Sequence, residues 1–429
     1  MLKLLTKPSP ILKQFIFGLK LSLSKPQEKH LLRISESIIL CDEKKTLSAL
    51  HRLMLDAPDE SATADFLSQS PWDDVEVKKA LAKFEIEYAI AKAKQEYKFK
   101  PEIIIALDDS TTRKDKDTKN LEAVSWHFDH AGAGKGQTQY CKGIVHLNLR
   151  IQIGSYGFTF TWRMYAREKQ IRKLNRKRHK NKRLRFKSKN TLAKEMLAEL
   201  KQYIPQGYKV YVLFDRWYTS AKLIRYIIRR GWHVIAAIKS NRKIDGIQIR
   251  KRSMQFKNKR CMKTKYVAAD GAEKYYFVHR IDGKLTGLPA EVCVLLSRRH
   301  NRDKTPKYFI CTDTELSVQK ILNLYSKRWP IEVEYWYLKN YLGLGDFRVW
   351  SYEAALKWYT IVYLILTFLQ WRLYEERDLR IQDCSINSVA KIIRMHRREK
   401  FIELIHLICR EAVQTQDAGF LINRFIGNA

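Results

Sequence analysis

The chain has 429 residues, enough for two or three domains with cores of their own. Hydrophobic residues make up 45% of it, which excludes a disordered chain. The 81 Lys and Arg residues against 45 Asp and Glu give a net charge of +36, and such an excess repels itself unless a polyanion neutralises it.

That polyanion is expected to be nucleic acid rather than a membrane surface. The basic residues are interspersed with 10 Trp, 22 Tyr and 18 Phe, and base stacking and phosphate contact use these side chains together. The alternative is a basic protein without a nucleic-acid partner. The seven cysteines are odd in number and follow no zinc spacing, so we expect a reducing compartment. The most apolar run, Trp358 to Leu369, is too short to span a bilayer and predicts a buried helix, with no membrane association.

Residues 1–99 have a helical pattern. Ser70, Pro71 and Asp73 are typical of a helix start, with Ser70 as the cap, and an apolar stripe follows between Val75 and Tyr97. We interpret the region as a helical module that binds DNA or, as the alternative, serves only for packing, because no helix-turn-helix pattern is evident.

A buried strand is expected from Ile103 to Leu107, ending in Asp108-Asp109-Ser110. A Gly-rich loop from Ala131 to Gly136 precedes two strands, Gly143 to Ile153 and Gly157 to Tyr165, which predict a hairpin. The segment His127-Phe128-Asp129-His130 imitates a metal site, but the pattern offers no fourth ligand and we favour a non-metal interpretation.

Residues 167–189 form a basic tract in which Glu168 is the one acid. Charge repulsion should keep the tract extended or mobile without a partner. We expect it to contact phosphates, the alternative being a solvated linker or a nuclear-localisation-like signal. The residues chosen as DNA contacts are Arg176, Lys177, Arg178, Lys182, Arg183 and Arg185.

A strand–helix–strand unit follows the basic tract. A helix from Thr191 to Gln202, capped by Asn190, leads into a strand that ends at Asp215. A helix from Ser220 to Arg230 and a strand from Trp232 to Ile238 complete the unit, which predicts a parallel strand pair.

The rest of the chain divides into strands and then helices. Residues 240–315 carry short strand patterns and no helix pattern, so a β-rich insertion is expected there, and residues 316–429 return to helices. The expected strands are Lys265 to Asp270, Lys274 to Asp282, Glu291 to Arg298 and Lys307 to Thr312. The predicted regions are 1–99, 100–239, 240–315, 316–370 and 371–429.

Three acids are candidates for chemistry. Asp108 and Asp215 each follow a predicted buried strand, where polar catalytic groups are held rigidly in open α/β sheets, and Glu332 lies in a predicted helix. Carboxylates brought together in this way repel one another unless a divalent cation neutralises them. Two metal ions about 4 Å apart bind both the attacking and the leaving oxygen of a phosphodiester. Oxygen ligands favour Mg²⁺, for which Mn²⁺ would substitute.

The surroundings of Glu332 have a specific spacing, Y-x2-R-x3-E-x6-K. Steps of three, four and seven residues fall on one face of a helix, so Tyr325, Arg328, Glu332 and Lys339 would form one stripe. Pro330 predicts a new helix start that kinks the stripe and puts Glu332 in a first turn. The alternative is an exposed helix with an Arg–Glu pair.

This pattern resembles the bacterial insertion-sequence transposases of the DDE class that carry the YREK signature. All four signature residues match in spacing, and Leu342-Gly343-Leu344-Gly345 follows Lys339. The run from Val212 to Tyr218 is similar to the family's second-acid motif, and Asp108-Asp109-Ser110 to its first. Asp109 is the alternative first metal ligand, and the Asp-x-Ser spacing favours Asp108.

The resemblance implies an α/β fold. An RNase H-like mixed sheet with flanking helices would be interrupted by a β-rich insertion, between N- and C-terminal helical regions. Arg328, Lys339 and Tyr325 would contact the DNA backbone, and Trp329 would either stack on an unpaired base or pack in the core.

The activity implied is metal-dependent cleavage at the ends of a mobile element and transfer of the 3′-hydroxyl to target DNA. The partners would be the double-stranded terminal repeats and the target, bound by a homodimer, because two paired ends call for two active sites. The bacterial cytoplasm, at the nucleoid, is the expected location. Alternatives are an inactive DNA-binding descendant, a related DDE nuclease, and an RNA-binding protein, for which the expected motifs are missing.

Overall fold

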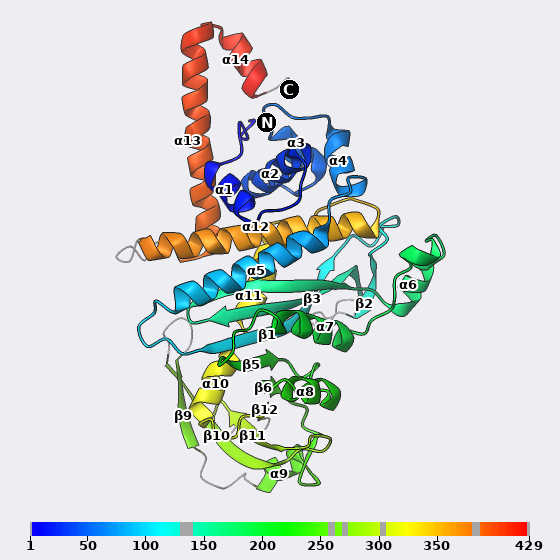
Figure 1. Ribbon diagram of the computed structural model, residues 1–429, viewed down its shortest axis with the longest axis vertical. Helices are drawn as coiled ribbons and strands as arrows, with labels where there is room; N and C mark the ends of the chain where they lie inside the picture. Colours follow the sequence, from blue (N-terminus) through cyan, green and yellow to red (C-terminus); the bar gives the residue numbers. More distant parts are fainter. Residues whose placement is uncertain are drawn as a thin grey trace.

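A computed structural model describes residues 2–128, 140–255, 262–267, 273–300, 306–379 and 387–426. A mixed sheet of ten strands forms its centre, with helices on both faces. A helical module from the start of the chain lies above the sheet in Figure 1, and a long helix from the end of the chain stands beside that module. The predicted loop at 131–136 lies outside the described residues.

Five strands give the sheet an RNase H-like order. The first of them, β1 (Glu102–Arg113), is antiparallel to β3 (Tyr140–Ile153), which is antiparallel to β4 (Tyr156–Tyr165). On its other edge β1 is parallel to β5 (Lys209–Phe214), and β5 is parallel to β6 (His233–Ala237). The predicted fold class is therefore confirmed, as are the hairpin of β3 and β4 and the parallel strand pair.

Strand β1 is longer than predicted. The expected strand ends at Leu107, whereas β1 stays paired with β3 as far as Arg113, opposite Gly143. Its parallel pairing with β5 stops at Leu107, opposite Phe214. Asp108 therefore lies where the strand loses its parallel neighbour, and not where the strand ends.

The β-rich insertion continues the central sheet. Strands β9 (Met262–Val267), β10 (Glu273–Lys284), β11 (Glu291–Arg298) and β12 (Lys307–Cys311) form an antiparallel series. Its last strand, β12, pairs antiparallel with β6, so backbone hydrogen bonds join the insertion to the five-stranded core.

The insertion also contains elements that the sequence analysis missed. A two-stranded ribbon, β7 (Lys243–Ile244) with β8 (Ile247–Gln248), leads into helix α9 (Ile249–Gln255). The expectation that no helix occurs between residues 240 and 315 is wrong, because a helix of seven residues is too short to show an apolar period.

Alternating side chains of β1 enter the cores on the two faces of the sheet. Ile103, Ile105 and Leu107 pack with α7 (Lys189–Lys201) and α8 (Ala221–Ile228). On the other face, Ile104 packs with α10 (Val318–Ser326) and Ala106 belongs to the core that includes α11 (Pro330–Asn340).

Two predicted helix caps are wrong. Asp73 caps α5 (Asp74–Ala93) by accepting from the Val75 amide, whereas Ser70 was expected. Ser188 caps α7 by accepting from the Thr191 amide, whereas Asn190 lies inside that helix. Several Ser, Asp and Asn residues precede each helix, and any of them satisfies the capping pattern.

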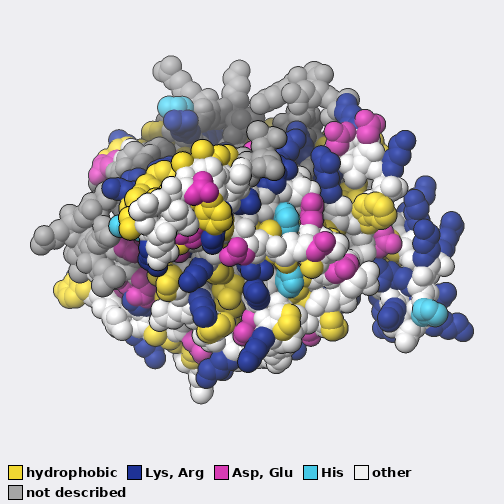
Figure 2. Space-filling model, turned by 90° about the horizontal axis from the view of Figure 1, so that it is seen from above, with side chains coloured by type: hydrophobic (Ala, Val, Ile, Leu, Met, Phe, Trp, Pro, Cys, Tyr) yellow, Lys and Arg dark blue, Asp and Glu magenta, His cyan; other side chains and the backbone are white. Residues whose placement is uncertain are grey.

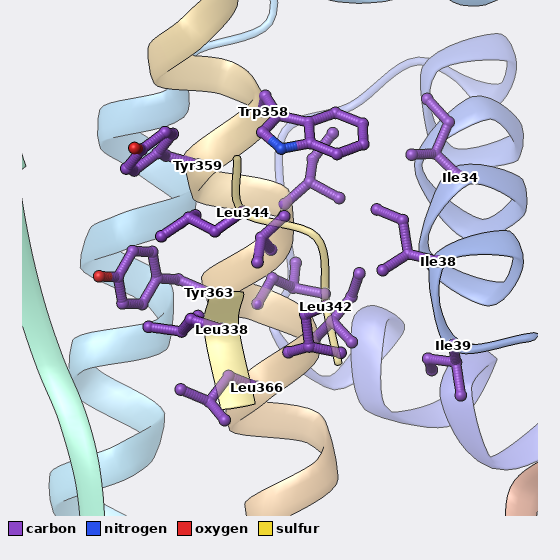
Figure 3. Close-up of a cluster of buried hydrophobic side chains, with 14 of the residues drawn as sticks. Ile34, Ile38, Ile39, Leu338, Leu342, Leu344, Trp358, Tyr359, Tyr363 and Leu366 are labelled. Carbon is purple, nitrogen blue, oxygen red and sulfur yellow. The ribbon is translucent and has the colours of Figure 1, made fainter. Parts of the chain in front are cut away.

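Helix α12 (Tyr352–Leu379) is the centre of the helical part. It packs against α2 (Lys25–Leu40) and α4 (Glu60–Ser68), and α1 (Pro10–Gly18) and α3 (Leu47–Arg52) complete the N-terminal module. Figure 3 shows isoleucines of α2 facing Trp358 and Leu366 across this core. All of the labelled side chains are buried.

In length and composition α12 would suffice to cross a membrane, but 83% of its apolar window is buried inside the protein. The predicted burial of Trp358 to Leu369 is confirmed, whereas the argument from insufficient length is wrong, since the helix has 28 residues. The predicted boundary at 370 falls within this helix. Two further helices, α13 (Val389–Thr415) and α14 (Ala418–Phe425), follow it and form a hairpin.

Glu334 shows how a buried charge holds α11 against the sheet. Its carboxylate accepts from the Arg150 Nε at 2.8 Å, from Thr159 at 2.5 Å and from Gln370 at 2.7 Å. Glu334 and Arg150 are 4% and 7% exposed, so each buried charge needs the other as its counter-ion.

We predict that Glu334→Gln lowers the free energy of unfolding by about 3–5 kcal/mol, because it leaves the buried Arg150 without its counter-ion. Urea denaturation measures the change. The control is Glu87→Gln, which removes an exposed i,i+4 partner of Lys83 and should change stability by less than about 0.5 kcal/mol. An equal, small effect of both substitutions would contradict the buried ion pair.

Candidate active site

Asp108 and Asp109 lie on opposite faces of the sheet, because successive side chains of a strand alternate. Asp108 faces α11, where the Tyr335 hydroxyl donates to the Asp108 carbonyl at 2.8 Å. Asp109 faces α7 and accepts from Lys189 Nζ and from the Tyr218 hydroxyl, each at 2.6 Å. Of the two adjacent acids, Asp108 is therefore the one on the side of Glu332.

Arg328 connects Asp108 to Glu332. Its guanidinium donates to Asp108 Oδ2 at 2.8 Å and to Glu332 Oε1 at 2.5 Å, and its side chain is only 14% exposed. Helix α10 ends at Ser326 and Pro330 starts α11, so Glu332 lies in a first turn as predicted. Arg328 lies in the break between the two helices, and its guanidinium reaches Asp108 of β1.

The other signature residues lie around this pair. The Tyr325 ring lies 6.0 Å from the Arg328 guanidinium, and its burial raises the pKa of the hydroxyl. Lys339 Nζ donates to Ser110 Oγ at 2.6 Å, which places the lysine on the Asp108 face of β1. All four residues of the spacing pattern therefore lie in one region of the structure.

Asp215 follows β5 directly, and its Oδ1 accepts from the Trp217 amide at 2.9 Å. The register of β1 and β5, continued by one residue, places it beside Asp108. Burial raises the pKa of Asp108 to about 7, and the negative charges of Asp109 and Asp215 add to the rise against the opposing effect of Arg328. Asp108 and Asp215 are thus close enough for the charge of one to act on the other, and Arg328 connects Glu332 to Asp108.

Two adjoining cavities open at these acids. Asp108, Glu332, Lys339 and Trp336 line one of about 390 Å³. Asp215, Arg328 and Trp329 belong to the wall of a second, of about 1190 Å³. Trp329 is 60% exposed, which excludes the alternative that it packs in the core.

The acids offer donors suited to a hard cation, with carboxylate oxygens and no thiolate. Within the described residues, however, no three His, Cys, Asp or Glu side chains are grouped closely enough to hold a metal ion. The guanidinium of Arg328 lies between two of the candidate ligands and neutralises them. A metal-binding arrangement therefore requires Arg328 to leave Asp108 and Glu332.

The basic tract is partly helical, and the expectation of an extended segment is wrong for those parts. Residues 168–175 form α6 (Glu168–Asn175), which buries Ile171 and Leu174, and a 3-10 turn follows at Lys180–Lys182. Arg178 pairs with Glu353 and Glu122 and is 14% exposed, so its guanidinium faces the protein. The other chosen cations are exposed, namely Arg176, Lys177, Lys182, Arg183 and Arg185. Figure 2 shows Lys and Arg side chains gathered on the projecting lobe at its right, on the side where α6 lies in Figure 1.

His127 lies in strand β2 (Ser125–Phe128), close to the Asp109 side of the site. Its Nε2 is 2.7 Å from Ser125 Oγ, and burial, followed by the charges of Arg167 and Lys189, lowers its pKa to about 4. Asp129 and His130, the other parts of the apparent metal motif, lie outside the described residues.

Sequence reasoning missed several residues that position the acids. Tyr335 holds the Asp108 backbone, and Lys189 and Tyr218 hold the Asp109 carboxylate. Tyr218 belongs to the motif around Asp215 and could have been chosen from it. Lys189 and Tyr335 carry no signal, because their roles depend on how helices pack across β1.

Comparisons with known proteins identify the family that this chain resembles. A family model described as "DDE superfamily endonuclease" matches residues 19–250, more than half of the chain. A second, described as "Transposase DDE domain", matches residues 163–368. A search of curated proteins found no match. Among solved structures, a cryo-EM structure of the piggyBac transposase synaptic complex with hairpin DNA is similar, with 11% identity and a TM-score of 0.48, covering 97% of this chain and 80% of that one.

The raised pKa of Asp108 predicts a stability that depends on pH. In the metal-free protein its carboxyl binds a proton more tightly when folded, at a pKa of about 7, than at the ordinary value of 3.8. Protonation therefore favours the folded state, and the free energy of unfolding falls as pH rises through this window.

The variant Asp108→Asn lacks this titration. We therefore predict that the free energy of unfolding of the variant, relative to that of the wild type, increases by on the order of 2 kcal/mol as pH rises from about 5 to about 7.5. Denaturation in chelator at several pH values measures the difference. A relative stability that is constant over this range would contradict the raised pKa.

Proposed function

Because the chain belongs to the DDE superfamily of endonucleases, we propose that it is a DNA transposase that cuts the ends of a mobile element and joins the 3′-hydroxyl to target DNA. The observation that carries the proposal is the convergence of Asp108, Asp215 and the Arg328–Glu332 pair at one edge of an RNase H-like sheet. The spacing around Glu332, which resembles the YREK signature, supports a transposase of the insertion-sequence type.

Asp108, Asp215 and Glu332 would hold two Mg²⁺ ions, for which Mn²⁺ would substitute, since hard cations prefer carboxylate oxygens. When bound, such ions stabilise the attacking and leaving oxygens of a phosphodiester. Asp109 is the weaker candidate for the first ligand, because Lys189 and Tyr218 already engage its two oxygens on the other face.

The Arg328 guanidinium can bind either the two carboxylates or a DNA phosphate. In the protein alone its guanidinium bridges Asp108 and Glu332. A guanidinium binds phosphate in the same forked manner, so the DNA backbone competes for it. Movement of Arg328 onto a phosphate would free both carboxylates at the moment when substrate is present, and Lys339 would hold a neighbouring phosphate.

Exposed aromatic and basic groups around the acids suit DNA. Trp329 would stack on an unpaired base, as its exposure allows. The exposed cations of the basic tract would contact the double-stranded terminal repeats and the target. Two element ends require two active sites, so we propose a homodimer on the paired ends, acting in the bacterial cytoplasm at the nucleoid.

We predict that Glu332→Gln abolishes cleavage of a duplex that carries the element end, a loss of at least about 100-fold, while leaving duplex affinity within about threefold. Gel analysis of labelled DNA with Mg²⁺ measures cleavage, and anisotropy measures binding. Asp109→Asn is the control on the other face of β1 and should retain cleavage. Full activity in Glu332→Gln, or loss of activity only in Asp109→Asn, would contradict the assignment.

Charge reversal on the exposed part of the basic tract tests its role. The double substitution Arg176→Glu with Arg183→Glu should lower duplex affinity by about tenfold or more and flatten its dependence on salt, because each lost phosphate contact lowers the logarithmic slope by about 0.9. Arg178→Ala serves as comparison, since this side chain is turned to Glu353. An unchanged salt slope in the double variant would make the tract a linker.

A further inference from the structure

A large basic cavity lies between the insertion and the catalytic acids. Its wall includes the β5–α8 turn with Asp215 and Arg216, residues between Ala237 and Met254, the end of β11 and the start of β12. Tyr325, Arg328 and Trp329 close it on the side of α10 and α11. The cavity therefore shares Asp215 and Arg328 with the active site.

Arg298 is the most unusual residue of this cavity. It ends β11 and is 7% exposed, yet it forms no ion pair within the part of the chain that the structure describes. Its Nε also lacks a hydrogen-bond partner there. Burying a guanidinium without a counter-ion is costly, so the position calls for an anion.

Four more cations surround Arg298, namely Arg216, Lys239, Arg250 and Lys307. All four are exposed, and none is in an ion pair with another described residue. Among the described residues that line the cavity, Asp215 is the only acid. Elsewhere in the described structure many exposed Lys and Arg side chains have carboxylate partners, as Arg52 has Glu43 and Lys187 has Glu195.

Hydrogen bonds hold the wall of the cavity in place. Ser253 of α9 donates to the Arg250 carbonyl at 2.7 Å, and its hydroxyl lies 3.3 Å from that of Tyr308 on β12. The Arg250 amide donates to the Ser240 carbonyl at 2.9 Å. Helix α9 is thus tied to the sheet, and it holds Arg250 at the rim of the cavity.

We propose that this cavity binds DNA backbone phosphates, with Arg298 at its base as the buried anion contact. A strand bound there passes Asp215 and Arg328, so the cavity holds DNA immediately beside the point of cleavage, away from the basic tract. This inference rests on the proposed function and adds a second DNA surface to it. The phosphates come either from the flank of the cleaved duplex or from a separate target duplex, and the test distinguishes these sources.

The test is DNA binding by the full chain without divalent metal, so that its outcome is independent of cleavage. The first variant combines Lys239→Ala, Arg250→Ala and Lys307→Ala, and the second is Arg298→Gln. The control combines Arg225→Ala with Arg229→Ala, two exposed cations that line a different cavity on α8. Thermal unfolding checks that each variant is folded, and the triple variant changes exposed side chains only.

Three duplexes separate the sources of phosphate. The first duplex ends at the cleavage position, and the second continues beyond it by about ten base pairs. The third is an unrelated duplex, added to the complex that the protein has formed with the first duplex. We expect the triple variant to weaken binding of the second or the third duplex by at least about tenfold and to lower its salt slope by about 2 to 3, as expected for three lost phosphate contacts.

A loss confined to the extended duplex assigns the cavity to the flank, and a loss confined to the unrelated duplex assigns it to the target. Arg298→Gln should reproduce the effect on the same duplex. Wild-type affinity and salt slope of the triple variant for all three duplexes, or an equal loss in the α8 control, would overturn the proposal.

Discussion

Like charges can share one edge of a sheet only if positive charge lies among them. Burial and the neighbouring acids Asp109 and Asp215 raise the pKa of Asp108 to about 7, and the bridging guanidinium of Arg328 opposes that rise. Arg328 keeps its own charge because Asp108, Tyr325 and Glu332 outweigh the effect of burial on its pKa. Arg328 lies in the break between α10 and α11, and it meets Asp108 where the pairing between β1 and β5 ends.

The insertion continues the sheet, and this pairing sets where its cations lie relative to the acids. Pairing of β12 with β6 fixes the insertion relative to β5 and hence to Asp215. Its cations, Arg298 above all, then face the acids across one cavity. Part of the excess positive charge therefore lies in the cavity beside Asp215, and part lies on the exposed basic tract. If DNA binds beside these carboxylates as proposed, the cations offset the repulsion between phosphates and carboxylates.

The sequence predicted the parts of the site that depend on local pattern. Strand–helix–strand order identified Asp215, and helical spacing with Pro330 identified Arg328 and the position of Glu332. It misjudged features that depend on partners distant in the chain. The length of β1 depends on its pairing with β3. The cap of α7 could not be chosen among several neighbouring polar residues. The expectation of an extended basic tract did not take into account that Ile171 and Leu174 are buried in a helix. The face of Asp108 relative to Asp109, and the buried Arg298, became evident only from packing.

The central claim is that Asp108, Asp215 and Glu332 act together on DNA with a divalent metal. The most direct measurement incubates purified protein and a labelled duplex carrying the ends of the encoding element with Mg²⁺, with Ca²⁺ or with neither, for the wild type and for Asp215→Asn. The account predicts nicks or hairpins at the element ends only for the wild type with Mg²⁺. Tight binding without cleavage under every condition would contradict it and indicate an inactive DNA-binding descendant, and equal cleavage by Asp215→Asn would remove Asp215 from the chemistry.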